Sequence, residues 1–123
     1  MKKIILILIT IFLTGCTSSI SKTGVITYQD AQELIKKDAV IIDVRTGDEY
    51  NEDHIDDAIL MTLDTINENV AKEKIKSKDS YVIVYCKSGN RSKQAQELLT
   101  SLGYTNVYNL GSINNWQEWK IFI

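Results

Sequence analysis

Apolar and polar positions recur in blocks along this chain, and the blocks predict helices and strands in turn. Thr27 has the character of a helix N-cap, with Asp30 three residues on, and the apolar spacing that follows predicts a helix over 28–37. A second helix is predicted over 92–102, closed by Gly103. Its apolar stripe consists of Ala95, Leu98, Leu99 and Leu102.

Short β-branched and aromatic runs predict the strands. The run at 81–85 is apolar throughout, as expected for a central parallel strand that is covered on both faces. Shorter runs at 39–42, 58–61 and 107–110 predict three more strands. Strands that alternate with helices imply an α/β fold, with a small parallel β-sheet flanked by helices on both faces.

Three further segments are predicted to be helical. One or two turns are expected over 49–54, and a polar segment with spaced apolar residues predicts a helix over 63–75. Trp116 and Trp119 stand three residues apart, which predicts a final helix with both rings packed in the core.

The start of the chain has the pattern of an export signal. Lys2 and Lys3 precede an apolar run at 4–13, which is too short to cross a bilayer, since that takes about 20 residues. The sequence Leu-Thr-Gly-Cys that ends at Cys16 resembles a bacterial lipobox. That resemblance implies cleavage before Cys16 and attachment of a diacylglyceryl group to its sulfur. An ordinary secretory signal with a chance cysteine is the alternative.

We therefore expect three parts: a lipoprotein signal peptide at 1–15, a lipid-anchored tether at 16–24 and a folded domain at 25–123. The protein would then be held in the bacterial cell envelope, on the periplasmic face or the cell surface, by lipid on Cys16. Because the chain has two cysteines, lipidation leaves Cys86 as a free thiol without a disulfide partner in its own chain.

Composition narrows the classes of function. The chain has 123 residues, 44% of them hydrophobic and 24% charged, which suits one packed domain. Its net charge is −2 and its basic residues are scattered, which excludes a nucleic-acid partner because phosphate binding needs a concentrated basic face. The carboxylates at 53, 56 and 57 are expected to form a solvated turn rather than a metal site. Nothing sets an oligomeric state, and a monomer is expected.

Cys86 is the main candidate for chemistry. It directly follows the predicted central strand, at the edge of a parallel sheet where ligands bind. The loop Cys86–Arg91 leads into a helix N-terminus, whose free N–H groups and dipole favour a thiolate over a thiol. Lys87 and Arg91 add positive charge, and Gly89 allows the backbone to form a nest for an anion.

The size of this loop indicates its cargo. Four residues separate Cys86 from Arg91, whereas cysteine-based phosphatases place five between their cysteine and arginine. A shorter loop makes a tighter cradle, which suits a terminal sulfur atom better than a tetrahedral phosphate.

Three ordered blocks carry a resemblance to a known family. They are IIDVRTGDEYNEDHIDDAI at 41–59, YCKSGNRS at 85–92 and LGYTNVYNLGSINNW at 102–116. Over 26–119 the chain resembles a single-domain rhodanese, a thiosulfate sulfurtransferase-like protein. It departs from the family pattern at Asp53 and Asp57, where glycine is usual, and at Ser112, which replaces the second glycine of a G-G-I motif.

The resemblance implies a ping-pong reaction without a metal or organic cofactor. Cys86 would take sulfur from a small anionic donor such as thiosulfate, become a persulfide and pass the sulfur to cyanide or a thiol. The substrate-binding residues would be Lys87, Ser88, Gly89, Asn90, Arg91 and Ser92. Structural roles near the site are implied for Asp43, Arg45, Glu49 and His54, with Glu49 a natural partner for Arg45.

Two other functions stay open at this point. One is a rhodanese-like module that carries sulfane sulfur for a partner, or senses redox state, without turnover. The other is a cysteine phosphatase or arsenate reductase, which the length of the loop disfavours.

Overall fold

The computed structural model describes residues 19–116, which form a four-stranded sheet with the strand order β2-β1-β3-β4. All neighbouring strands run parallel. The strands are β1 (Val40–Asp43), β2 (Ile59–Leu60), β3 (Tyr81–Cys86) and β4 (Asn106–Ser112). The parallel sheet predicted from the sequence is confirmed, with β3 between β1 and β4 as its central strand, buried from Val82 to Cys86.

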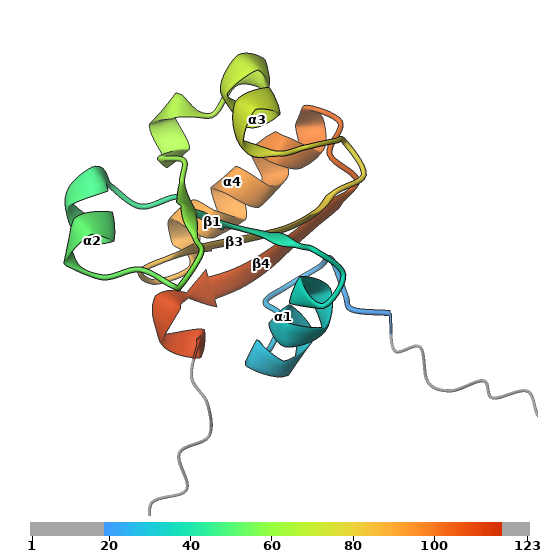
Figure 1. Cartoon of the computed structure of the whole chain (residues 1–123), viewed down its shortest axis with the longest axis horizontal. Helices are drawn as coiled ribbons and strands as arrows, with labels where there is room; N and C mark the ends of the chain where they lie inside the picture. The colour runs from blue at the N-terminus through green and yellow to red at the C-terminus, as the bar shows by residue number, and fades with distance from the viewer. Residues whose placement is uncertain (1–18, 117–123) are drawn as a thin grey trace, which may run out of the picture.

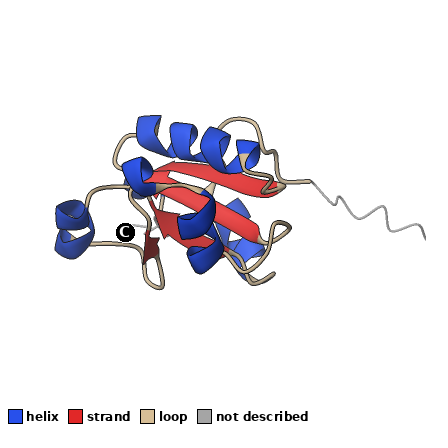
Figure 2. Cartoon of the chain, turned by 90° about the horizontal axis from the view of Figure 1, so that it is seen from above, coloured by secondary structure: helices blue, strands red, loops and turns tan. Residues whose placement is uncertain are grey.

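Helices cover both faces of this sheet (Figure 1). The helix α1 (Tyr28–Ile35) lies on one face, and α3 (Glu68–Lys74) and α4 (Asn90–Ser101) lie on the other. Figure 2 shows the long helix α4 lying along the strands. Each face has its own apolar core: Leu34 of α1 belongs to one, and Leu99 of α4 belongs to the other. Burial of these two faces is the main driving force for the fold.

Two helices begin with the same hydrogen-bonded cap. Thr27 Oγ1 accepts from the Asp30 N–H, and the Thr27 N–H donates to the Asp30 carboxylate, both at 3.1 Å, which confirms the predicted start of α1. Thr46 and Glu49 form the equivalent pair at the start of α2 (Gly47–Glu52). The predicted helical turns are therefore present, beginning two residues earlier than expected because Thr46 is the cap.

The single helix predicted over 63–75 is wrong. The chain forms a 3-10 turn, η1 (Leu63–Thr65), and then starts α3 afresh. Ile66 is extended between them, and Asn67 Oδ1 accepts from the Val70 N–H at 2.9 Å. Asn67 is a good N-cap because its side chain bonds backbone N–H groups, so it begins a new helix rather than continuing an old one.

The predicted final helix is, in the described part of the chain, only the 3-10 turn η2 (Ile113–Asn115). Trp116 follows it and packs edge-on against Tyr28 of α1, with ring centroids 5.0 Å apart. Trp119 lies outside the described residues. The interpretation of Trp116 as a packing residue agrees with this contact.

The predicted signal peptide and Cys16 also lie outside the described residues. Of the tether, residues 19–24 are described: Ile20 packs against the core, and the Lys22 carbonyl accepts from Gln96 Nε2 of α4 at 2.8 Å. Within residues 19–116, no helix is long and apolar enough to cross a membrane.

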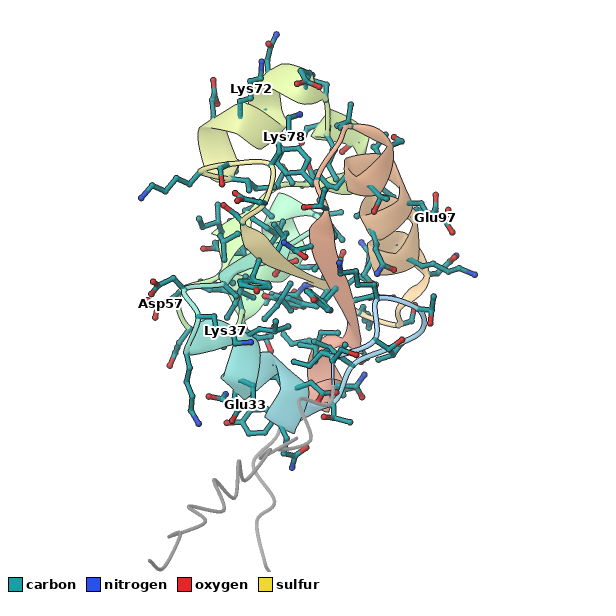
Figure 3. The ribbon with its side chains drawn as sticks, turned by 90° about the vertical axis from the view of Figure 1, so that its right-hand side faces the viewer. Glu33, Lys37, Asp57, Lys72, Lys78 and Glu97 are labelled. Carbon is teal, nitrogen blue, oxygen red and sulfur yellow. The ribbon has the colours of Figure 1, made fainter. Side chains whose placement is uncertain are left out.

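The end of the sheet where β3 begins is closed by Lys78, which Figure 3 shows beside α3. Its ammonium group donates to Glu68 at 2.9 Å and to the Leu102 carbonyl at 2.7 Å, and it lies 4.4 Å from the centre of the Tyr104 ring. The opposite end, where the parallel strands finish, is left for the candidate site.

Candidate active site

Cys86 is the last residue of β3, and α4 begins only four residues later at Asn90. The linker is therefore shorter than the loop predicted from the sequence, and Arg91 and Ser92 stand in the first turn of α4. Gly89 is the N-cap, with φ +99°, a left-handed conformation that glycine adopts without steric cost. This glycine lets the chain turn sharply enough to aim the helix N-terminus at the cysteine.

The sulfur of Cys86 lies inside a cradle of hydrogen-bond donors. The Gly89 N–H donates to Sγ at 2.9 Å, the Ser92 N–H donates at 3.4 Å, and Ser92 Oγ lies 3.5 Å away. Burial of the residue raises the pKa of the Cys86 thiol, but hydrogen bonds from the Ser92 hydroxyl and from the N–H groups of Ser92, Gly89 and Ser88 outweigh it. The net pKa is lowered from its ordinary value, which favours the thiolate.

Ser92 is placed under the sulfur rather than at the mouth of the site. It is fully buried, and its hydroxyl donates to the Gly89 carbonyl at 3.0 Å. Of the residues predicted to bind substrate, Lys87, Ser88 and Asn90 have exposed side chains, whereas Ser92 does not. Ser92 thus contacts the sulfur from the interior of the protein rather than from the solvent side.

A β-bulge in β4 backs this cradle. Val84 of β3 pairs with Asn109, but the next residue of β3, Tyr85, pairs with Gly111, so Leu110 is the extra residue. The shift brings Ser112 beside Cys86, where its hydroxyl donates to the Lys87 carbonyl at 2.6 Å. The departure at Ser112 therefore adds a hydrogen bond that ties the loop to β4.

Asp43 and Arg45 form a buried ion pair beside the site, as expected of scaffold residues. The guanidinium donates to the Asp43 carboxylate at 2.8–3.1 Å through Nε and Nη2, and Nη2 also donates to the Asp53 carbonyl at 2.6 Å. The Tyr85 hydroxyl donates to Asp43 Oδ2 at 2.7 Å and accepts from the Ile55 N–H at 3.2 Å. This network joins the ends of β1 and β3 next to Cys86.

The sequence pattern does not single out Tyr85 as a member of this network, because the run at 81–85 predicts only a buried strand. The available signal was the phenol itself. A tyrosine buried at the end of a central strand needs a partner for its hydroxyl, and Asp43 is that partner.

The expected pairing of Glu49 with Arg45 is wrong. Both carboxylate oxygens of Glu49 accept from Arg91, at 2.7 and 3.0 Å, while Arg45 is occupied by Asp43 and lies 3.6 Å from Asp53. The hydrogen bond from Arg91 lowers the pKa of Glu49 to about 2, and the same bond raises the pKa of Arg91. The pair links α2 to the first turn of α4.

His54 has local contacts, as predicted. Its Nδ1 lies 2.8 Å from the Tyr50 carbonyl, and its ring stacks on the Tyr50 ring with centroids 3.8 Å apart. No group of His, Cys, Asp or Glu side chains within residues 19–116 is arranged to hold a metal ion.

The two aspartates that replace family glycines differ in conformation. Asp57 has φ +67°, in the left-handed region, whereas Asp53 has φ −164° and is extended. Figure 3 shows Asp57 on the side of the molecule that carries Lys37 of α1, opposite Glu97 of α4. Asp57 is therefore the one of the two at which a glycine-like backbone is required.

This combination of a parallel sheet, a cysteine at its carboxyl edge and a helix N-terminus around the sulfur agrees with the comparisons with known proteins. The sequence model of the rhodanese-like domain family matches residues 27–118 of this chain. The chain belongs to the rhodanese-like family. The thiosulfate sulfurtransferase PspE of Escherichia coli is 38% identical over 74 residues, covering 60% of this chain and 70% of the relative.

A second relative and a solved structure extend this similarity. The thiosulfate sulfurtransferase GlpE of Coxiella burnetii is 36% identical over 96 residues, covering 77% of this chain and 85% of the relative. A structure described as rhodanese with anions from E. coli has a TM-score of 0.58 at 36% identity, covering 63% of this chain and 89% of its own. At the level of the family, these relatives support a sulfurtransferase, with a sulfur donor and a sulfur acceptor as its substrates.

Proposed function

We propose that this rhodanese-like protein transfers sulfane sulfur through a persulfide on Cys86. The Cys86 thiolate attacks the outer sulfur of thiosulfate or a similar donor, forming a new S–S bond. Sulfite leaves with the electron pair of the S–S bond that breaks. Cyanide or a thiol then attacks the outer sulfur of the persulfide, and the Cys86 thiolate is released. Each half-reaction needs a thiolate that is stable both as nucleophile and as leaving group.

The observation that carries this proposal is the cradle of donors on Sγ. Gly89 and Ser92 supply N–H groups at 2.9 and 3.4 Å, and these lower the pKa of Cys86 despite its burial. This activation needs no histidine, which matters because the chain has one histidine and the ring nitrogen Nδ1 of His54 is already bonded to Tyr50. A helix N-terminus can activate a cysteine by itself.

The geometry also supports sulfur rather than phosphate as the cargo. Only residues 87–89 separate β3 from α4, and Sγ is already within hydrogen-bond distance of two N–H groups of the cradle. A small terminal sulfur atom needs less room above Sγ than a tetrahedral phosphate.

A sulfur carrier without rapid turnover is the second candidate. The observation that favours it is that Cys86 has no solvent-exposed surface, which would slow the approach of a small donor from solvent. A slow exchange of sulfur with a specific protein partner would suit such a site.

One assay and one mass measurement separate these functions. The thiosulfate:cyanide reaction should release thiocyanate, and Cys86→Ser should abolish it. Intact mass after thiosulfate should show a gain of one sulfur in the wild type and none in Cys86→Ser. A gain of sulfur without thiocyanate release would favour the carrier. Release of phosphate from an aryl phosphate, or no gain of sulfur by the folded protein, would refute sulfur transfer.

We also propose that the mature protein begins at a lipidated Cys16 and lies on the extracytoplasmic side of a bacterial membrane. The proposal rests on the resemblance of the residues before Cys16 to a lipobox. Intact mass of the mature protein should show cleavage before Cys16 and the added diacylglyceryl group. A mature chain without lipid, or no loss of membrane association in Cys16→Ser, would refute it.

A further inference from the structure

Glu49 occupies the charged end of Arg91, the arginine next to the cysteine cradle. The guanidinium Nη1 and Nη2 donate to Oε1 and Oε2 at 2.7 and 3.0 Å, which is the two-pronged geometry of a strong ion pair. Both side chains are partly buried, with 26% of Glu49 and 31% of Arg91 exposed. Since the two are 42 positions apart along the chain, the fold rather than local sequence brings them together.

We propose that Glu49 is a specificity-determining residue, which turns the site away from donors with two negative charges and toward sulfane-sulfur donors with one. The proposal rests on the proposed sulfurtransferase function and concerns which donors it accepts. Thiosulfate stands for the first class, and an organic thiosulfonate stands for the second.

The first step concerns the charges around the cradle. Arg91 stands in the first turn of α4, next to Ser92, whose N–H contacts Sγ at 3.4 Å, so its charge lies near the sulfur, and the thiolate in turn raises the pKa of Arg91. Glu49 cancels much of that charge. Because the bond to Arg91 holds the pKa of Glu49 near 2, the cancellation persists at every pH at which the thiolate reacts. Lys87, which follows Cys86 directly, is an exposed cation that Glu49 does not pair with.

The same helix adds further negative charge. Asp48 and Glu52 of α2 are exposed on either side of Glu49. An anion that approaches Arg91 therefore comes near a helix that carries three carboxylates, one of which is already paired with the guanidinium. The repulsion that it feels is proportional to its own charge.

This proportionality gives a quantitative expectation. If removing the charge of Glu49 favours a donor with one negative charge by a given factor, it favours a donor with two by about the square of that factor. A change that merely disturbs the fold or the cysteine would affect both donors by the same factor. The ratio of the two donors thus separates an electrostatic role from a structural one.

The experiment compares thiosulfate with methanethiosulfonate, in which a methyl group replaces one charged oxygen. The chemistry is otherwise matched, since Cys86 attacks the outer sulfur of either donor, and sulfite or methanesulfinate leaves with the electron pair. The variant is Glu49→Gln, whose amide oxygen can still accept from the N–H and the hydroxyl of Thr46 in the cap of α2. The control is Glu52→Gln, which removes the same charge from an exposed position on the same helix.

For Glu49→Gln, we expect kcat/KM to rise about tenfold with thiosulfate and about threefold with methanethiosulfonate, through KM rather than kcat. Glu52→Gln should change both by less than about twofold. Added salt should shrink the difference between the variants. Equal changes for both donors, or equal effects of Glu49→Gln and Glu52→Gln, would overturn the proposal.

A second variant guards against a Glu49→Gln protein that does not fold. Arg91→Lys keeps the positive charge but cannot form the two-pronged pair, so it should shift the donor ratio in the same direction by a smaller factor. An unchanged or opposite ratio would count against Glu49. Persulfide formation on Cys86, measured by intact mass with both donors, tests the proposed function separately. If neither donor forms a persulfide, the proposed sulfur transfer is refuted. If a persulfide forms and the donor ratio is unchanged, only the role of Glu49 is refuted.

Discussion

Ser92 contacts the sulfur of Cys86 twice, through its amide nitrogen at 3.4 Å and through its hydroxyl oxygen at 3.5 Å. The hydroxyl also donates to the Gly89 carbonyl at 3.0 Å. A hydroxyl has a single hydrogen, so it can donate either to that carbonyl or to the sulfur. It can accept from the thiol form of Cys86 and donate to the thiolate form, which stabilises the charged sulfur from inside the protein.

Ser92→Ala should therefore raise the pKa of Cys86. The variant loses the hydroxyl that lowers this pKa, while burial, which raises it, remains. The measurement is the rate of alkylation by iodoacetamide as a function of pH, whose midpoint should move to higher pH. The control is Ser88→Ala, since the Ser88 hydroxyl has no hydrogen-bond partner among residues 19–116 and only its backbone acts on the thiolate. A midpoint that Ser92→Ala leaves in place would contradict the role of the hydroxyl.

Tyr85→Phe should destabilise the protein by about 1–3 kcal/mol, the cost of leaving buried polar groups without a partner. The variant removes the donor to Asp43 and the acceptor for the Ile55 N–H. Urea unfolding at pH 7 measures the effect. Tyr28→Phe is a control at a tyrosine whose ring packs on Trp116 but whose hydroxyl has no partner in the described chain. If Tyr85→Phe lowers the free energy of unfolding by no more than Tyr28→Phe does, water must replace the two hydrogen bonds of the Tyr85 hydroxyl.

Asp43→Ala should cost more, about 3–5 kcal/mol, because it leaves the buried Arg45 guanidinium without its carboxylate. The same urea titration measures this loss. Asp56→Ala, at an exposed position, should change the free energy of unfolding by less than about 0.5 kcal/mol. An Asp43→Ala protein as stable as the Asp56→Ala protein would contradict a structural role for the pair.

Replacing Asp57 by glycine should stabilise the protein by up to about 1 kcal/mol. Asp57 has φ +67°, which strains a residue with a Cβ, and glycine relieves that strain at some cost in chain entropy. Asp53→Gly is the matched change at the other aspartate, and it should destabilise because Asp53 is extended and contacts Arg45 at 3.6 Å. Thermal unfolding of the two variants should give shifts of opposite sign. Shifts of the same sign would show that backbone conformation does not decide the effect.

The ion pair between Glu49 and Arg91 should make stability depend on pH in the acid range. The pKa of Glu49 is lowered in the folded state from 4.5 to about 2, so its contribution is present above pH 4.5 and is lost as the pH falls toward 2. Glu49→Gln should therefore be less stable than the wild type at pH 7, and the gap should narrow below pH 4.5. Urea titrations at several pH values measure it. A gap that is constant with pH would show that the carboxylate charge contributes nothing.

Much of the fold could be predicted from local sequence, because the deciding interactions are local or periodic. The buried run of β3 and the cap at Thr27 each depend on residues within one turn or strand, and both are confirmed. The prediction of one helix over 63–75 is wrong because an asparagine such as Asn67 can be either a polar surface residue inside a helix or the N-cap of a new helix. Only the extended conformation of Ile66 decides between them.

The partners in the site could not be predicted in the same way. The sequence placed Cys86 at the end of a strand and before a helix, which the structure confirms. It could not show that Glu49 would contact Arg91 instead of Arg45, since both arginines are equally compatible with its charge. That choice depends on where α2 lies relative to α4, which is a property of the packed domain.

The bulge at Leu110 makes the length of β4 part of the chemistry. In a regular strand of the same sequence, Leu110 would pair with Tyr85 and Gly111 with Cys86, which would carry Ser112 past the end of β3. Most of the core could still pack, since the earlier pairs of β4 would keep their register. The loop next to the reactive sulfur, however, would lose the hydrogen bond from the Ser112 hydroxyl to the Lys87 carbonyl. The extra residue thus sets which residue of β4 stands beside the cradle, a matter of phase rather than of composition.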